Sequence, residues 1–244
     1  MQALGIDIGG SGIKGAPVNI KTGKLLAERL RIKTPKGAKP KPVAEVVAEI
    51  VHSFNWTGSV GIGFPAPIKH GVPMMAANVS QKWVGINADE LFTSMMGCPC
   101  KVGNDADVAG MAEMAFGAGK GQQGTVIMIT LGTGIGSAIF NNGHLLPNTE
   151  FGHMQMDGRD AEHHASDAAR QQDDLSWKKY AKRLNTYLSE MEKLFWPDLV
   201  IVGGGISKEH EKFLPLLELQ TKIMPAQFQN EAGIVGAALF SQSD

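Results

Sequence analysis

The pattern of apolar and polar positions predicts two strand-turn-strand units, one in each half of the chain. Residues 125–130 are β-branched and apolar, as in a buried strand, and residues 137–140 form a second apolar run. Between them lies Leu-Gly-Thr-Gly-Ile-Gly at 131–136, and Asn-Asn-Gly at 141–143 then reverses the chain. A similar unit, with strand, glycine turn and strand, occupies residues 4–15.

Glycine corners of this kind expose backbone N–H groups against which an anion can lie. The first corner also carries a carboxylate, Asp7, and a cation, Lys14, and the second adds the hydroxyl of Thr133. Either corner alone could be a tight turn with nothing bound. Two corners together predict a site for a chain of phosphates.

The remaining pattern predicts a mixed α/β chain. Residues 3–8, 12–20 and 25–33 are predicted to form three antiparallel strands. Further strands are predicted at residues 60–65, 101–105 and 198–202. Helices are predicted at residues 43–52, 106–116, 175–195 and 232–240. Between the third strand and the first helix, residues 34–42 form a Pro/Lys loop, which is either a solvated segment or a contact for a polyanion.

Asn104 and Asp105 lie where a short strand is predicted to give way to a helix. In open α/β sheets ligands bind at that edge. A polar side chain there can equally be the helix N-cap, so both interpretations stay open.

Bulk properties exclude several classes of protein. The chain has 244 residues and a formal net charge of −1, which argues against a nucleic-acid or membrane-surface partner. No apolar run reaches the roughly 20 residues of a membrane span, and the first residues do not resemble a signal peptide. The two cysteines, Cys98 and Cys100, are expected to be free thiols, and a cytoplasmic location is expected.

Other glycine and histidine motifs fit less well. Residues 10–15 match the dinucleotide-binding fingerprint in form, but that fingerprint opens a helix and here a strand follows. A group of histidines and aspartates suggests a metal site, but its spacing fits no common ligand pattern. Its members are His153, His163, His164, Asp157 and Asp160.

Five motifs taken in order resemble the sugar kinases of the repressor/open-reading-frame/kinase (ROK) family. They are Asp-Ile-Gly-Gly-Ser at 7–11, Asn104-Asp105, Gly-Thr-Gly-Ile-Gly at 132–136, Glu-Phe-Gly-His at 150–153 and Gly-Gly-Gly at 203–205. Residues 148–153, 196–199 and 232–238 resemble the polyphosphate-using branch of that family. The resemblance covers essentially the whole chain.

The resemblance implies an actin-like ATPase (ribonuclease H-like) α/β fold, with two α/β domains around a cleft. Residues 1–104 would form the small N-terminal domain, with the C-terminal helix at 231–244 packed back on it, and residues 105–230 the large domain. The implied reaction is phosphorylation of glucose, and of mannose as a further sugar, by polyphosphate, ATP or both, with Mg²⁺. A homodimer is expected on the same ground.

Residue roles follow from the same resemblance. Asp105 matches the general base that accepts the proton of the sugar 6-hydroxyl. The sugar ligands would be Asn78, Asn104, Asp105, Glu150, His153 and Glu162. The phosphate-binding residues would be Asp7, Gly9, Gly10, Ser11, Gly12, Lys14, Gly132, Thr133 and Gly134, with Gly203, Gly204 and Gly205 on the nucleotide side. Asp7 would hold Mg²⁺ through water.

Three points stay open at this stage. Many relatives carry a cysteine-rich zinc motif after Glu-x-Gly-His, whereas this chain has Met-Gln-Met-Asp-Gly at 154–158, so we expect no zinc. The donor preference is undetermined, with the lysines of 33–41 and the basic residues of 178–183 as candidate polyphosphate contacts. An ATP-only glucokinase, a sugar-sensing non-catalytic ROK protein and an actin-like assembly protein are the alternatives.

Overall fold

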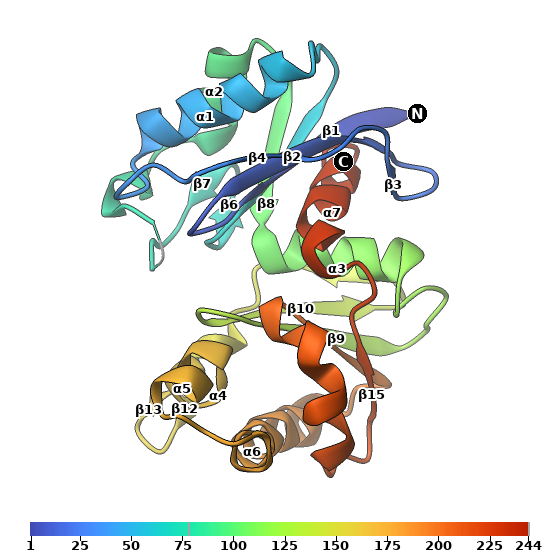
Figure 1. Ribbon diagram of the computed structural model, residues 1–244. Helices are drawn as coiled ribbons and strands as arrows, with labels where there is room; N and C mark the ends of the chain where they lie inside the picture. The colour runs from blue at the N-terminus through green and yellow to red at the C-terminus, as the bar shows by residue number, and fades with distance from the viewer. Residues whose placement is uncertain (78, 244) are drawn as a thin grey trace. The chain divides into compact units, whose positions relative to one another are not determined.

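The computed structural model describes residues 1–77 and 79–243, which divide into two compact units. The first unit comprises Met1–Ala112 and Glu231–Asp244, and the second comprises Glu113–Asn230 (Figure 1). The division falls inside helix α3 (Asp105–Phe116) rather than at its first residue.

The first unit is built on a six-stranded mixed sheet with the order β3-β2-β1-β5-β8, in which β4 also pairs with β2. β1 and β2 are antiparallel, whereas β1, β5 and β8 run parallel. The strands are β1 (Gln2–Ile8), β2 (Ile13–Asn19), β3 (Lys24–Leu25), β4 (Leu30–Ile32), β5 (Val60–Phe64) and β8 (Cys100–Asn104). A separate two-stranded ribbon pairs β6 (Ile68–Lys69) with β7 (Val72–Pro73).

Helices cover both faces of this sheet (Figure 1). α1 (Pro40–Ser53) and α2 (Ala88–Met96) enclose the main core with the apolar side chains of the strands. α7 (Ala232–Phe240) packs on β1 and β5 from the other side. The predicted helix 232–240 therefore has its predicted ends and lies on the N-terminal sheet.

The predicted third strand, 25–33, was wrong as a continuous element, because the structure splits it into β3 and β4. The carbonyl of Pro17 accepts a hydrogen bond from Leu26 N, so Pro17 faces this side of β2. Proline has no N–H to donate there, and the ladder is interrupted between the two short strands.

The second unit repeats the same plan with the order β11-β10-β9-β14-β15. β9 and β10 form an antiparallel hairpin, and β9, β14 and β15 run parallel. The strands are β9 (Thr125–Leu131), β10 (Ile135–Asn141), β11 (His144–Leu146), β14 (Leu199–Gly203) and β15 (Lys222–Pro225). The predicted central hairpin is thus present.

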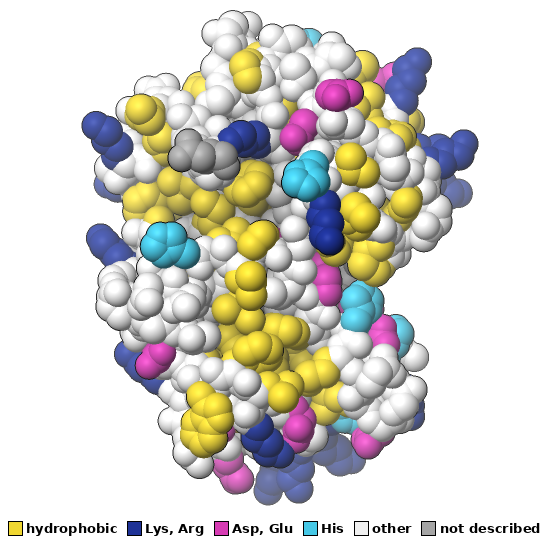
Figure 2. All heavy atoms as spheres, turned by 180° about the vertical axis from the view of Figure 1, so that it is seen from behind, with side chains coloured by type: hydrophobic (Ala, Val, Ile, Leu, Met, Phe, Trp, Pro, Cys, Tyr) yellow, Lys and Arg dark blue, Asp and Glu magenta, His cyan; other side chains and the backbone are white. Residues whose placement is uncertain are grey.

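The longest helix, α6 (Trp177–Phe195), covers the sheet of the second unit with the apolar face that its sequence predicts. Tyr180, Leu184 and Tyr187 on that face are fully buried. Its opposite face carries exposed lysines, and Lys and Arg side chains gather where α6 lies (Figure 2). The other short elements of this unit are the helices η2 (Phe151–His153), α4 (Glu162–Ala165), α5 (Asp167–Gln172), η3 (Gly205–Lys212), η4 (Leu214–Leu216) and η5 (Gln229–Glu231) and the ribbon of β12 (Gln155–Met156) and β13 (Arg159–Asp160).

Glu113 ties the beginning of the second unit to its end. Its fully buried carboxylate accepts hydrogen bonds from Ala118 N at 2.9 Å and Phe228 N at 2.7 Å.

Both cysteines are free, as predicted. Among the described helices, none combines the length and apolar character that a bilayer crossing requires.

Candidate active site

The first glycine turn joins β1 to β2 and is fixed by its neighbours. Gly9 N donates to Gly12 O at 3.1 Å, and the hydroxyl of Thr34 donates to Gly9 O at 2.6 Å. Arg31 lies on the outside of the turn, where its Nη2 donates to the carbonyl oxygen of Ser11 at 3.1 Å. Arg31 lies in the strand before the Pro/Lys loop and Thr34 is the first residue of that loop, so the loop is anchored beside the turn.

Asp7 and Lys14 form an ion pair at the two ends of this turn, with Lys14 Nζ 3.1 Å from Asp7 Oδ2. The register of the hairpin places the two residues directly opposite each other. Gly233, in the first turn of α7, leaves room beside the carboxylate, because a Cβ at that position would lie 2.9 Å from Asp7 Cγ. A half-buried carboxylate and ammonium thus lie next to open backbone.

Asn104 and Asp105 occupy the junction of β8 and α3. The Asn104 side-chain oxygen accepts hydrogen bonds from Ala106 N at 2.8 Å and Asp107 N at 3.1 Å, so Asn104 caps the helix. Asp105 is the first helical residue, and its Oδ1 accepts from Ala106 N at 2.8 Å. The capping interpretation therefore applies to Asn104, and the half-buried Asp105 carboxylate lies at the carboxyl edge of the parallel strands.

The second glycine turn joins β9 to β10 in the other unit and touches the third glycine motif. Gly204, at φ +81°, lies so close to Leu131 that a Cβ would be 2.4 Å from the Leu131 carbonyl oxygen. Gly203 pairs with Thr130 across the sheet. The structure therefore brings the loops 132–134 and 203–205 side by side.

Glu162 contacts the same turn from α4. Its Oε2 accepts a hydrogen bond from Ile135 N at 3.3 Å, and a Cβ on Gly134 would lie 2.3 Å from that oxygen. A carboxylate expected to bind sugar is therefore held against a loop expected to bind phosphate.

Glu150 and His153 lie on a segment that Ser137 fastens to β10. The Ser137 hydroxyl donates to Thr149 O at 2.7 Å and accepts from Phe151 N at 3.0 Å, and Thr149 Oγ1 donates to Ser137 O. Ser137 is only 1% exposed. These bonds set the position of Glu150 and of η2, which carries His153.

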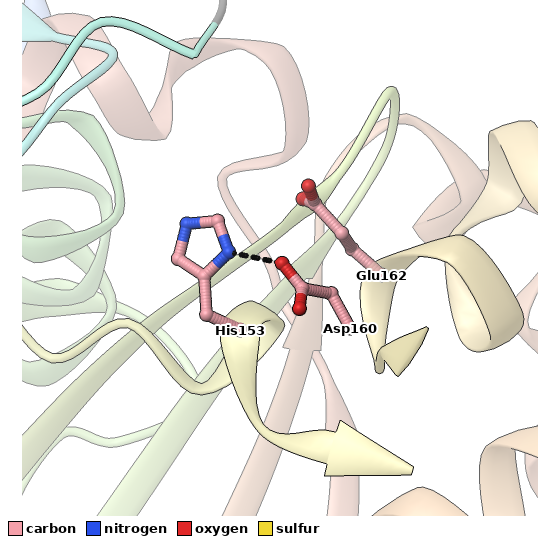
Figure 3. A group of neighbouring side chains, drawn as sticks. All are labelled: His153, Asp160 and Glu162. Carbon is pink, nitrogen blue, oxygen red and sulfur yellow. Dashed lines mark hydrogen bonds and ion pairs between the residues drawn. The ribbon is translucent and has the colours of Figure 1, made fainter. Parts of the chain in front are cut away.

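His153, Asp160 and Glu162 converge in the second unit (Figure 3). His153 Nδ1 and Asp160 Oδ2 are 2.7 Å apart, and Gln155 Nε2 donates to Asp160 Oδ1 at 2.5 Å. The Asp160 hydrogen bond raises the pKa of His153, burial opposes the rise, and Glu162 and Glu150 add to it. The same bond lowers the pKa of Asp160, and Gln155 lowers it further.

Cation binding is a second possibility for this group, because one ligand atom from each residue lies within 4.8 Å of the others. A cation would have to displace the hydrogen bond between His153 and Asp160. The sequence spacing had argued against a metal site here, yet two of the residues considered there, His153 and Asp160, do meet. The expected absence of zinc stays a prediction.

The predicted site residues thus form two groups, one in each unit. The first unit holds Asp7, Gly9, Gly10, Ser11, Gly12, Lys14, Asn104 and Asp105. The second holds Gly132, Thr133, Gly134, Glu150, His153, Glu162, Gly203, Gly204 and Gly205. Asn78, the remaining predicted sugar ligand, lies outside the described residues.

Sequence reasoning missed three residues that support the site, Arg31, Thr34 and Ser137, and considered Asp160 only as a member of a metal group. The position of Asp160 opposite Gln155 did have a usable signal nearby. Asp157 and Gly158 both have positive φ, at 51° and 77°, and Asp-Gly is the typical two-residue hairpin turn that pairs Gln155 with Asp160.

Comparison with known proteins adds relatives along the whole chain. The sequence model of the ROK family matches residues 3–169. A polyphosphate glucokinase of Mycobacterium tuberculosis is 47% identical over 244 residues, covering 100% of this chain and 92% of that protein.

Two solved structures are similar throughout. An inorganic polyphosphate/ATP-glucomannokinase from Arthrobacter sp. strain KM has a TM-score of 0.95 and 51% identity, covering 98% of both chains. A ROK family glucokinase from Streptomyces griseus, solved with glucose and AMPPNP, has a TM-score of 0.82 and 26% identity, covering 98% of this chain and 99% of that one. These likenesses confirm the expected actin-like ATPase fold with two α/β domains. Since both the family pattern and relatives of nearly equal length match, this chain belongs to the ROK family.

Proposed function

We propose that this protein is a glucokinase that transfers a phosphoryl group from inorganic polyphosphate or ATP to the 6-hydroxyl of glucose, and also of mannose. The observation that carries the proposal is the full-length identity with a polyphosphate glucokinase and with a polyphosphate/ATP-glucomannokinase. The local geometry of the two glycine turns and of the carboxylates supports it.

Asp105 is the general base in this proposal. A sugar hydroxyl is a weak nucleophile, and a carboxylate that takes its proton as the new bond forms contributes roughly 10²–10⁴-fold to the rate. Asp105 Oδ1 is hydrogen-bonded to Ala106 N, which fixes the carboxylate at the start of α3. The proton moves from the sugar hydroxyl to this carboxylate, and the hydroxyl oxygen forms the bond to the terminal phosphorus of the donor. The phosphoanhydride bond to that phosphorus breaks, and ADP or a polyphosphate shortened by one phosphate leaves.

Each unit contains side chains that are proposed to bind sugar hydroxyls. The first unit has Asn104 and Asp105, the second has Glu150, His153 and Glu162, and Asn78 is a further proposed ligand. Within the second unit, the carboxylates of Glu150 and Glu162 around the His153 imidazole favour a ligand with several hydroxyl groups. Such sites discriminate strongly against analogues that lack one of those groups.

Each glycine turn is proposed to bind phosphate through its own backbone. Residues 9–12 with Lys14, and residues 132–134, would donate N–H groups, a hydroxyl and an ammonium to them, and residues 203–205 would serve the nucleotide side. Asp7 suits Mg²⁺, which takes one or two carboxylates with several waters and substrate phosphates, and Gly233 leaves space beside it. When bound, Mg²⁺ would neutralise charge on the transferred phosphate.

Of the two basic segments, the Pro/Lys loop is proposed over the basic face of α6 as the path of a long polyphosphate. Thr34 binds the backbone of Gly9, so the loop begins on the first phosphate turn. Lys33, Lys36 and Lys39 are all exposed along it. The expected homodimer and cytoplasmic location belong to the same proposal.

A coupled assay of sugar 6-phosphate formation tests the proposal. Glucose and mannose are each offered with polyphosphate and with ATP, with and without a chelator of Mg²⁺. We expect product from glucose with polyphosphate and its loss on chelation. Product with ATP alone would favour the ATP-only alternative, and no product with either donor would refute the proposed reaction.

A further inference from the structure

The residue behind His153 has no role in the reaction as described so far. Asp160 lies on β13, with Oδ2 2.7 Å from His153 Nδ1, and its side chain is 30% exposed. In Figure 3 the second ring nitrogen of His153 points away from Asp160. We propose that Asp160 is a positioning residue that holds the His153 imidazole with its proton on Nδ1 and leaves Nε2 to face a sugar hydroxyl.

The direction of the hydrogen bond follows from the chemistry of the pair. The pKa of Asp160 is lowered, so near neutral pH its carboxylate has no proton to give. His153 Nδ1 must therefore be the donor, in the neutral ring as well as in the imidazolium. This fixes the tautomer and keeps the same nitrogen, Nε2, available to a ligand.

Asp160 is itself held in place by the ribbon of β12 and β13. The register pairs Gln155 with Asp160, and Gln155 Nε2 donates to the second carboxylate oxygen at 2.5 Å. Each carboxylate oxygen thus has one donor, His153 on Oδ2 and Gln155 on Oδ1. These two hydrogen bonds fix the carboxylate, and a fixed carboxylate orients the imidazole that donates to it.

The charges around the ring are consistent with this role. The acidic groups that face His153 are Asp160 from β13, Glu162 from α4 and Glu150 from the segment before η2. His163 acts on Asp160 from α4. Asp160 makes a direct hydrogen bond to the ring, so its removal changes orientation as well as charge.

The inference rests on the proposed function for its kinetic part but not for its spectroscopic part. Asp160→Asn keeps the shape of the side chain and removes its charge. Asp157→Asn is the matched control, because it removes the same charge from the exposed turn of the same ribbon and tolerates the positive φ there. Nitrogen NMR of His153 without sugar gives its tautomer and its pKa, and steady-state kinetics give kcat and KM for glucose.

In Asp160→Asn we expect the pKa of His153 to fall and the Nε2-protonated tautomer to appear. The KM for glucose should rise roughly tenfold, as for loss of one charge-assisted hydrogen bond, with kcat much less affected. Asp157→Asn should match the parent protein in all of these. An unchanged tautomer and KM in Asp160→Asn would overturn the inference, whereas an inactive parent protein would overturn the proposed function instead.

Gln155→Ala provides a second variant should Asp160→Asn fail to fold. It removes an exposed side chain and one of the two donors to the Asp160 carboxylate. We expect a smaller fall in the pKa of His153 and a smaller rise in KM. A His153 tautomer and pKa identical to those of the parent protein would contradict the positioning role.

Discussion

Gly134 has no side chain beyond a hydrogen atom, and this leaves room for the carboxylate of Glu162 to lie against the second glycine turn. A Cβ at 134 would lie 2.3 Å from Glu162 Oε2. That oxygen is the end of a flexible side chain, so it can move away without moving the backbone. We therefore propose that a change in the phosphate-binding turn at Gly134 affects sugar binding, and that it does so through the Glu162 side chain alone.

Gly134→Ala is predicted to displace the Glu162 carboxylate and leave the fold intact. The KM for glucose should rise by roughly tenfold, because one sugar-hydroxyl ligand is moved, and the melting temperature should stay close to that of the parent. Steady-state kinetics and thermal unfolding check both parts. A normal KM would show that Glu162 does not bind the sugar from its position on this turn.

The pair of His153 and Asp160 also predicts a pH dependence of stability. The folded-state pKa of His153 is raised above 6.5, so its contribution is complete below that pH and is lost as the pH rises through the raised value. The pKa of Asp160 is lowered below 3.8, so its contribution is present above that pH and is lost as the pH falls through the lowered value. The pair therefore stabilises the protein most between these limits.

The melting temperature of Asp160→Asn should accordingly fall further below that of the parent protein at about pH 5.5 than at about pH 9. The lowered pKa of His164, caused by burial and Arg183, is common to both proteins and cancels in the difference. A gap between the two melting temperatures that does not change with pH would contradict the ion pair.

At the scale of elements, two loops of the second unit are in close contact. Gly204, between β14 and η3, packs on the backbone of Leu131 at the end of β9. Its φ of +81° is one that L side chains rarely adopt. A substitution there meets rigid backbone, in contrast to Gly134.

Gly204→Ala is therefore predicted to lower stability by about 2 kcal/mol or more, which corresponds to roughly 4–8 °C in melting temperature. Gly205→Ala is the matched control, since a Cβ there has no neighbour within 4 Å and its φ is ordinary. Thermal unfolding of both variants measures the difference. Equal melting temperatures would mean that the contact with Leu131 is not rigid.

Elements with long, regular patterns could be predicted from the sequence, and short ones could not. α6 and the hairpin of β9 and β10 follow directly from their apolar periodicity. The break between β3 and β4 depends on which way Pro17 faces, and a strand pattern does not contain that information. The ribbon of β12 and β13 has two residues in each strand, too few for any alternation to show.

The motifs of the candidate site could be predicted from the sequence, but the residues that hold those motifs in place could not. Residues 132–134 and 203–205 were each recognisable, whereas their contact depends on the parallel pairing of β9 with β14. Ser137 and Asp160 act through side-chain hydrogen bonds to residues 5 to 14 positions away, and a polar residue in a strand or ribbon gives no sign of its partner.

At the scale of the whole molecule, one plan is used twice. In each unit an antiparallel hairpin continues into two parallel strands, and the glycine turn closes the hairpin. The plan explains why the phosphate-binding candidates come in two sets far apart in the sequence. The plan does not distinguish polyphosphate from ATP as the phosphoryl donor. Surface charge can, and the sequence contains two basic segments, residues 33–41 and 178–183, that are candidate contacts for polyphosphate.

The exposed lysines in and just before the Pro/Lys loop are predicted to bind polyphosphate. Replacing Lys33, Lys36 and Lys39 by Gln should raise the KM for polyphosphate by roughly tenfold and flatten its increase with salt, because fewer counterions are released on binding. The matched control replaces Lys178, Lys179 and Lys182 on the exposed face of α6. A larger effect from the α6 variant would assign the polyphosphate path to that helix.

Asp105→Asn tests the central claim most directly, by measuring glucose 6-phosphate formation from polyphosphate and, in parallel, glucose binding without donor. The account predicts that the rate at saturating substrates falls by about 10²–10⁴-fold while the glucose affinity stays close to that of the parent protein. A variant that turns over at the parental rate would contradict the assignment of Asp105 as the base.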